Sequence, residues 1–210
     1  MKSLTDCIPS VESLMRRANR DKPVPPTEES MAKMAGKLAE FGYDKINAEV
    51  YSAICSYGAL LFDRTAHKGL LLKGECGIGK TFGVEIIAAI FQMPVFTPAD
   101  FAGAYKDLDG NPVDLEKYVT TGGDFFCEPK SIVIDEIGTK DNVKNWGETA
   151  EIMADVLDIR YRAFNRYGVR TIVTTNLSDR EIMARYGTRI VDRLAEMFYI
   201  KRVAGKSLRR

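Results

Sequence analysis

The stretch Gly74-Glu75-Cys76-Gly77-Ile78-Gly79-Lys80-Thr81 follows the apolar run of residues 69–73 and precedes the apolar-periodic residues 82–91. These flanks predict a buried strand that turns into a helix. Three glycines let successive backbone N–H groups point at one anion, and the helix adds its positive end. Lys80 can then reach the β- and γ-phosphates of a nucleotide, and the Thr81 hydroxyl can bind magnesium. An ordinary glycine turn is the alternative, and both flanks argue against it.

Composition describes an ordinary globular chain. The chain has 210 residues, of which 45% are hydrophobic and 28% charged, with a net charge of +1. A chain of this length can bury one good core. No apolar run reaches membrane-spanning length, and the first residues lack the order of a signal peptide, so we expect a cytoplasmic protein without membrane attachment. The small net charge argues against a protein whose whole surface is basic and binds nucleic acid, but it is compatible with a local basic patch.

The cysteine and histidine residues of this chain do not indicate a metal site. Cys7, Cys55, Cys76 and Cys127 lie far apart without a C-x-x-C pair, so neither a zinc site nor a disulfide framework is indicated. The single histidine, His67, precedes the first predicted strand. A lone histidine there is more often a surface residue than a catalytic base.

The N-terminal region predicts a short helical extension at residues 1–65, ahead of a main domain at residues 66–210. A helix is expected over residues 9–19, and the proline-rich residues near 21–27 then form either a linker or a surface loop. Helices are predicted from Thr27 to Phe41 and from Ile46 to Leu61, each with one apolar face. Those faces pack either on the core or on a partner protein, and the core is the commoner case.

Strands and helices alternate after residue 66. Strands are predicted at residues 94–97, 131–136, 171–176 and 198–203, and helices at 146–167, 179–186 and 188–197. This order predicts an α/β fold with a parallel sheet flanked by helices. Residues 99–128 stay unassigned, because their aromatic residues are spread among glycine and aspartate.

Polar residues end two of these strands. Asp135 and Glu136 follow one apolar strand and Asn176 ends the next, and parallel strands bring such ends to one edge of the sheet. Asp135 is predicted to hold magnesium beside Thr81, and Glu136 to act as general base toward water. Asn176 can bind that water or the γ-phosphate. Capping of the following turn is the structural alternative for each residue.

Four segments resemble the AAA+ ATPases, and within them the DnaC/DnaI-type helicase loaders and the IstB-type transposition helpers. They are residues 74–81, 132–136, 174–177 and 186–194, and the likeness spans about residue 68 to the end. It implies a P-loop NTPase fold of AAA+ type that binds ATP and Mg²⁺ and hydrolyses ATP at a low intrinsic rate. The nucleotide-binding residues are expected to be Gly74, Cys76, Gly77, Ile78, Gly79, Lys80, Thr81 and Phe82.

The resemblance also implies that subunits share their active sites. Arg193, or else Arg189, is then an arginine finger that completes the site of a neighbour in an ATP-bound homo-oligomer. Two solvated arginines one helical turn apart are the alternative. The chain departs from most AAA+ proteins because few residues follow the last predicted strand, so no C-terminal helical lid is expected. Arg209 then either approaches the nucleotide in its place or belongs to a frayed basic tail.

Single-stranded DNA and a replicative helicase or transposase are the expected partners. Residues 185–210 contain eight Lys or Arg against two Asp or Glu, a patch that can follow a phosphate backbone. Phe101, Tyr105 and Lys106 are candidates to stack on bases. The resulting hypothesis is a helicase loader-type ATPase. The alternatives are an IstB-type transposition helper, a P-loop small-molecule kinase, and a binding module that holds ATP without hydrolysing it.

Overall fold

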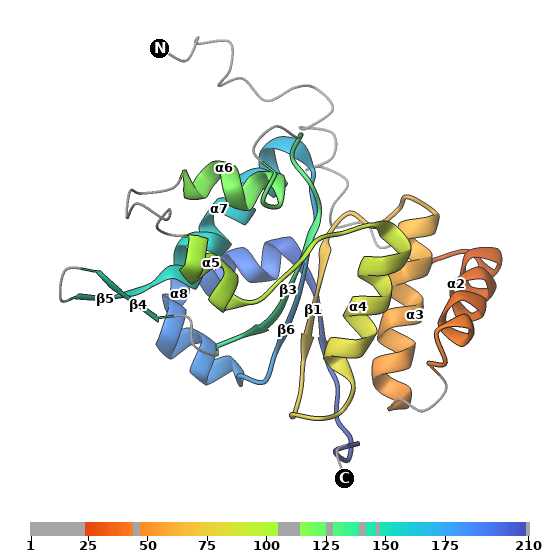
Figure 1. The fold of residues 1–210 in the computed structure, drawn as a ribbon. Helices are drawn as coiled ribbons and strands as arrows, with labels where there is room; N and C mark the ends of the chain where they lie inside the picture. Colours follow the sequence, from red (N-terminus) through yellow and green to blue (C-terminus); the bar gives the residue numbers. More distant parts are fainter. Residues whose placement is uncertain are drawn as a thin grey trace.

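The sheet is the centre of an α/β fold (Figure 1). A computed structural model describes residues 24–43, 47–104, 114–124, 128–138, 142–145 and 148–208. Five strands lie in the order β2-β3-β6-β1-β7, and all neighbouring pairs are parallel. Their bounds are β1 Gly69–Lys73, β2 Val95–Phe96, β3 Ile132–Ile137, β6 Thr171–Thr175 and β7 Phe198–Arg202. The predicted α/β class, with a parallel sheet flanked by helices, is confirmed.

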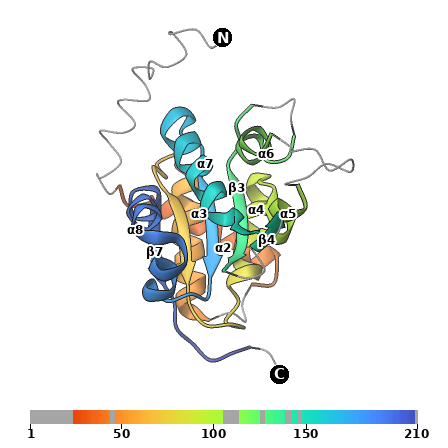
Figure 2. The same ribbon diagram turned by 90° about the vertical axis from the view of Figure 1, so that its left-hand side faces the viewer.

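Helices cover both faces of the sheet, as Figures 1 and 2 show. One face carries α3 Ala48–Phe62 and α4 Lys80–Phe91, with α2 Glu28–Glu40 outside them; the other carries α5 Pro98–Ala104, α6 Leu115–Thr121, α7 Ile152–Tyr167 and α8 Asp179–Met197. Successive residues of a strand point to opposite faces. Accordingly Leu70 and Leu72 join the core under α3 and α4, whereas Leu71 joins the core under α7 and α8. Both cores therefore depend on the same short apolar strand.

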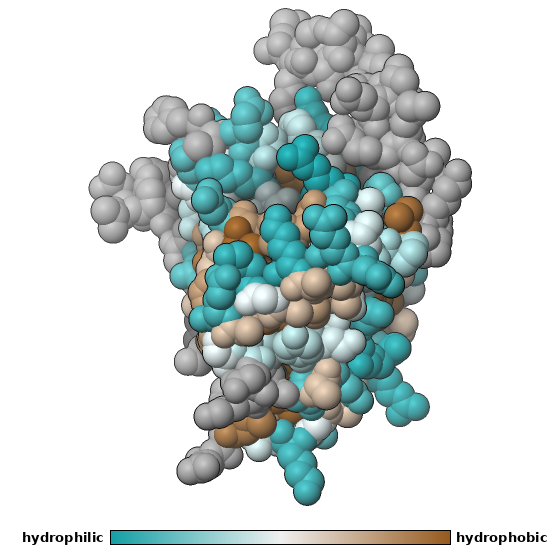
Figure 3. Space-filling model, turned by 90° about the vertical axis from the view of Figure 1, so that its right-hand side faces the viewer, coloured by the Kyte–Doolittle hydropathy of each residue, from teal (hydrophilic) through white to brown (hydrophobic). Residues whose placement is uncertain are grey.

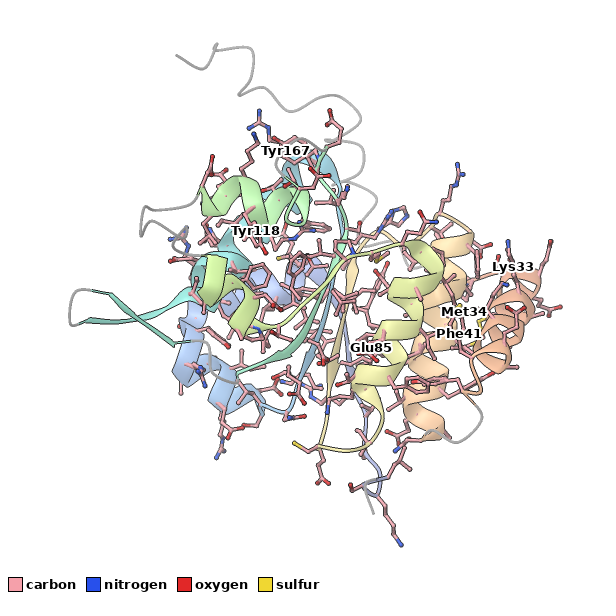
Figure 4. All side chains as sticks on the ribbon, viewed as in Figure 1. Lys33, Met34, Phe41, Glu85, Tyr118 and Tyr167 are labelled. Atoms are coloured by element: carbon pink, nitrogen blue, oxygen red, sulfur yellow. The ribbon has the colours of Figure 1, made fainter. Side chains whose placement is uncertain are left out.

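The N-terminal helices α2 and α3 belong to the first of these cores. In Figure 4, Met34 lies between α2 and α3. A Cβ atom on Gly58 of α3 would lie 2.4 Å from the Met34 sulfur, so glycine lets the two helices approach. Figure 3 shows hydrophilic and weakly apolar residues interspersed on the outer face that α2 presents. The apolar faces of α2 and α3 thus pack on the core. The predicted domain division at residue 65 stays a prediction.

The predicted helix at residues 146–167 is wrong at its start. Strands β4 Asn142–Asn145 and β5 Glu148–Glu151 pair antiparallel in a separate hairpin, and α7 begins only at Ile152. Because the backbone groups of residues 148–151 pair across this hairpin, they cannot form the first helical turns. Apolar residues at helical spacing on α7 are buried, including Val156 and Ala163.

Further expectations concern α8 and residues 99–128. The predicted break between two helices is confirmed, because Gly187 in α8 has non-helical backbone angles with φ 79°. The unassigned region contains α5 and α6. The expectation that Phe101 stacks on bases is wrong, because its ring is fully buried against Phe96 and Tyr118, the latter labelled in Figure 4.

Some expectations lie outside the described residues. They include the helix at residues 9–19, the first part of the linker, Cys7, Tyr105, Lys106, Cys127 and Arg209. Of the helices that the structure does describe, none has the length and apolar character needed to cross a membrane.

Candidate nucleotide site

The loop after β1 has the backbone conformation that its glycines allow. Gly77 and Gly79 adopt positive φ angles of 80° and 95°, and Gly79 directly precedes the first turn of α4. A Cβ atom on Gly74 would lie 2.2 Å from the carbonyl oxygen of Val203, so no larger residue fits where the loop leaves the sheet. Ile78 is fully buried and anchors the loop in the core. The loop therefore leads directly into the N-terminus of α4, the end of a helix that attracts anions.

Lys80 joins this loop to the end of strand β6. Its Nζ donates hydrogen bonds to the carbonyl oxygens of Gly74 and Glu75 at 2.8 and 2.7 Å, and to Asn176 Oδ1 at 2.6 Å. The side chain is largely buried, so its positive charge lies inside the loop. Two residues that the sequence singled out separately, Lys80 and Asn176, are thus in direct contact.

Asp135 and Glu136 lie at the same edge of the sheet. Ile134 pairs with Val173 and Ile137 with Thr175, so two residues of β3, Asp135 and Glu136, oppose one residue of β6. This is a β-bulge, a feature that re-aims side chains near functional sites. Asp135 is buried and Glu136 is partly buried. The strand ends therefore converge as the sequence predicted.

The backbone at Glu136 is strained. Its φ of 57° lies in the left-handed region, which costs a residue with a side chain roughly 1–2 kcal/mol. Such a conformation persists only where surrounding contacts determine it, and it is commonest at functional sites. The strain turns Glu136 out of the regular alternation of β3.

Thr174 is a residue of this site that sequence reasoning missed. Its hydroxyl donates a hydrogen bond to Asp135 Oδ1 and accepts one from the Glu136 backbone N–H at 2.8 Å. Thr175 makes the corresponding contacts one residue later, with the Ile137 carbonyl and the Leu177 N–H. The only sequence signal was the pair of threonines at the end of an apolar strand.

Two further segments contact the loop: the chain between α2 and α3, and the chain after β7. The buried Tyr43 hydroxyl donates to the Gly79 carbonyl at 3.4 Å, and its ring contacts Phe82, which is 47% exposed. Burial raises the pKa of Tyr43, so this hydroxyl keeps its proton at neutral pH. The Leu208 N–H donates to the Gly77 carbonyl at 2.8 Å. The loop is thus supported from both sides.

Magnesium fits the donor set at this edge. Mg²⁺ usually takes one or two protein ligands and fills its octahedron with water and phosphate oxygens. Asp135 and Thr81 are the ligand types required, and the described residues contain no cluster of three or more His, Cys, Asp or Glu side chains that would form a self-contained metal site. Both residue types fit a magnesium ion whose remaining ligands are water and phosphate oxygens.

The two candidate finger arginines lie elsewhere, on α8. Arg193 forms an ion pair with Asp158 of α7 and lies over the Tyr161 ring, 4.7 Å from its centre. Arg189 is 3.5 Å from the same carboxylate, but its side chain is 75% exposed against 17% for Arg193. No described contact joins either arginine to the loop of its own chain.

Comparisons with known proteins give a distant likeness. No protein-family model matches the chain, and no curated protein does. A solved structure of DnaI is similar over 64% of this chain and 72% of its own, with 18% identity and a TM-score of 0.48. A proposed primosome component from Streptococcus pyogenes serotype M3 is similar over 87% and 84%, with 16% identity and a TM-score of 0.46.

A further neighbour is a Pif1 structure from a Bacteroides species in complex with ADP-AlF4, with 13% identity and a TM-score of 0.39. It is similar over 78% of this chain, which spans 43% of that protein. The structural neighbours thus include proteins of the DnaI type that the sequence resembles. At these identities the likeness concerns the fold and not the activity.

Proposed function

We propose that this chain binds ATP with Mg²⁺ and hydrolyses it as an assembly factor of the helicase-loader type. The observation that carries the proposal is the contact of Lys80 in the loop with Asn176 at the end of β6, beside the acidic pair of β3. A phosphate cradle, a metal ligand and a candidate base thereby share one sheet edge. That combination serves phosphoanhydride hydrolysis.

Each residue has a proposed role. The loop from Gly74 to Phe82 holds the phosphates, and Lys80 can exchange its carbonyl partners for phosphate oxygens. Thr81 and Asp135 bind the magnesium, which neutralises charge on the phosphates when it is present. Glu136 accepts a proton from the attacking water, and Asn176 orients that water or the γ-phosphate.

An arginine finger acts on the ATP site of a neighbouring subunit, so this part of the proposal requires an oligomer. Arg193 is our first candidate and Arg189 the alternative. In a single chain Asp158 holds Arg193, so supplying its guanidinium to a neighbour requires this pair to open. We therefore expect slow hydrolysis by isolated chains and a rate that rises with protein concentration.

DNA and a protein partner are the least direct part of the proposal. Lys201 and Arg202 of β7 and Lys206 after it are exposed, and they support an electrostatic contact with single-stranded DNA. The expected protein partner is a replicative helicase, with a transposase as the alternative. Phe101 cannot contribute stacking, since its ring is fully buried.

The test is ATP hydrolysis by mixed variants, with and without single-stranded DNA. Glu136→Gln should keep nucleotide binding and lose about 10²–10⁴-fold in rate, as expected on loss of a general base. Arg193→Ala should lose on the order of 10³-fold in a fully assembled sample. Mixing these two inactive variants should restore activity, since one supplies the finger and the other the base.

Arg180→Ala is the matched control, an exposed arginine in the first turn of the same helix. Arg189→Ala is measured beside it to decide between the two candidates. If Glu136→Gln stays active and a small acceptor gains the γ-phosphate, the chain is a kinase. If nucleotide binds without turnover under every condition, ATP is only a structural ligand.

A further inference from the structure

One threonine hydroxyl stands between the two acidic residues of the site. We propose that Thr174 is a positioning residue that sets both Asp135 and Glu136 for catalysis. The proposal rests on the function proposed above and concerns how its acidic pair is aimed. It starts from two hydrogen bonds of Thr174 Oγ1, one donated to Asp135 Oδ1 and one accepted from the Glu136 N–H.

In these two bonds the Thr174 hydroxyl acts once as a hydrogen-bond donor and once as an acceptor. A threonine hydroxyl has one proton to donate and lone pairs to accept with. The proton goes to the Asp135 carboxylate, which leaves one carboxylate oxygen directed elsewhere. A lone pair receives the Glu136 N–H, the group displaced from the regular ladder by the bulge. Valine, with the same shape, can do neither.

Burial makes this arrangement specific. Thr174 is fully buried and Asp135 is nearly so, hence water has little access to replace a lost hydroxyl. A β-branched side chain also has few rotamers in a strand. The hydroxyl is therefore a fixed link between β6 and the bulged end of β3.

The link explains the unusual backbone of Glu136. Its positive φ requires contacts that outweigh the preference for an extended strand. The bond from its N–H to Thr174 is one such contact, because it fixes the Glu136 backbone inside the bulge. Through this bond the orientation of the Glu136 side chain depends on a residue 38 positions later.

The neighbouring threonine supplies a matched control. Thr175 is equally buried, ends the same strand, and also donates to a β3 carbonyl and accepts from a backbone N–H. Its hydroxyl contacts neither Asp135 nor Glu136 in these bonds. Thr175→Val therefore removes the same chemical groups from the same strand end without releasing the acidic pair.

The experiment compares Thr174→Val, Thr174→Ser and Thr175→Val for kcat, for KM of ATP, and for the Mg²⁺ concentration that gives half-maximal hydrolysis. Outer contacts of metal sites typically contribute about 10–100-fold to metal affinity or activity. We expect Thr174→Val to lower kcat and raise the Mg²⁺ requirement together by that factor. KM for ATP should change little, because the phosphate loop is intact, and Thr174→Ser should restore most of the rate.

Equal losses in Thr174→Val and Thr175→Val, or an unchanged Mg²⁺ requirement in Thr174→Val, would overturn the proposal. Melting temperature is followed for each variant, and Thr174→Cys, of similar size with a weak donor, replaces valine if that variant does not fold. Complete lack of hydrolysis by wild type would refute the ATPase and not this link. In that case Mg²⁺-dependent binding of ATP is compared, and Thr174→Val must lose more of it than Thr175→Val.

Discussion

Replacing Arg160 by methionine should destabilise the fold without touching the nucleotide site. Arg160 lies on α7 and is fully buried, and within the part of the chain that the structure describes its hydrogen bonds go to a hydroxyl and to backbone carbonyls rather than to a carboxylate. Its guanidinium donates to the Thr171 hydroxyl at 2.9 Å and to four backbone carbonyls at 3.0–3.4 Å, those of Val119, Thr120, Lys130 and Arg170. Burial lowers its pKa to about 9, so it remains a cation at neutral pH.

The magnitude follows from the groups left behind. Methionine can fill much of the volume, but it leaves the Val119 and Lys130 carbonyls and the Thr171 hydroxyl without this donor, at roughly 1–3 kcal/mol for each one that water cannot reach. The Thr120 and Arg170 carbonyls keep the backbone N–H groups of Lys130 and Ile132 as donors at 3.1 Å. The lost cation no longer has to be desolvated, which offsets part of the cost. We expect a net loss of about 3–5 kcal/mol in the free energy of unfolding, because three groups lose a donor and part of their cost is offset.

Urea unfolding measures the effect. With an m-value of about 1–3 kcal/mol/M, the midpoint should fall by about 1–5 M, and the melting temperature by roughly 6–20 °C. Arg166→Met is the matched control, an exposed arginine on the same helix over the Tyr167 ring, and should lose about 1 kcal/mol or less. A loss below about 1 kcal/mol for Arg160→Met would refute the reasoning, because the carbonyls would then have found other donors.

Two predictions concern ion pairs of α8. Hydrogen bonds from Lys73 and Arg202 lower the pKa of Asp179 below its ordinary 3.8. These bonds therefore stabilise the fold above pH 3.8, and this stabilisation is lost as the pH falls through the lowered pKa. Asp179→Asn should flatten the fall in the free energy of unfolding on acidification, measured by urea unfolding on both sides of pH 3.8. If an arginine of α8 is the finger, Asp158→Asn should release it and lower the protein concentration needed for half-maximal hydrolysis; because Asp158 contacts both Arg193 and Arg189, an unchanged concentration dependence would count against both.

Much of the fold was predictable because its signals are local. The buried strands are short continuous apolar runs, and the loop between β1 and α4 combines glycines with a lysine at fixed spacing. The hairpin of β4 and β5 was not predictable in the same way. The helical period of α7 extends back into residues 148–151, and only Gly147 argued against a helix there.

Arg160 and Phe101 show a different kind of error. Arg160 sits on the stripe of Val156 and Ala163, one helical turn from each, so its burial could have been predicted from spacing. No role was predicted for it from the sequence. Phe101 was predicted to contact DNA from its place between two strands of the sheet, yet a lone phenylalanine is more often part of the core.

The placement of the acidic pair depends on residues far apart in the chain. No local pattern distinguishes the bulge at Asp135 and Glu136 from a regular strand end, because it exists only in register with β6. The sequence could therefore predict which residues meet but not that Glu136 is strained. Thr174 was passed over for the same reason, since its partners are 38 and 39 positions away.

Arg160 and Thr174 act on the same pair of strands at opposite ends. Arg160 binds the Lys130 carbonyl before β3 and the Thr171 hydroxyl at the start of β6, whereas Thr174 binds the residues at which β3 ends. The two ends of a parallel pair have different tasks, because only the carboxyl ends face the ligand. Stability and catalysis should consequently separate along β3 and β6. Arg160→Met should lower stability with kcat nearly intact in the folded protein, whereas Thr174→Val should lower kcat by more than any loss of stability that it shares with Thr175→Val explains.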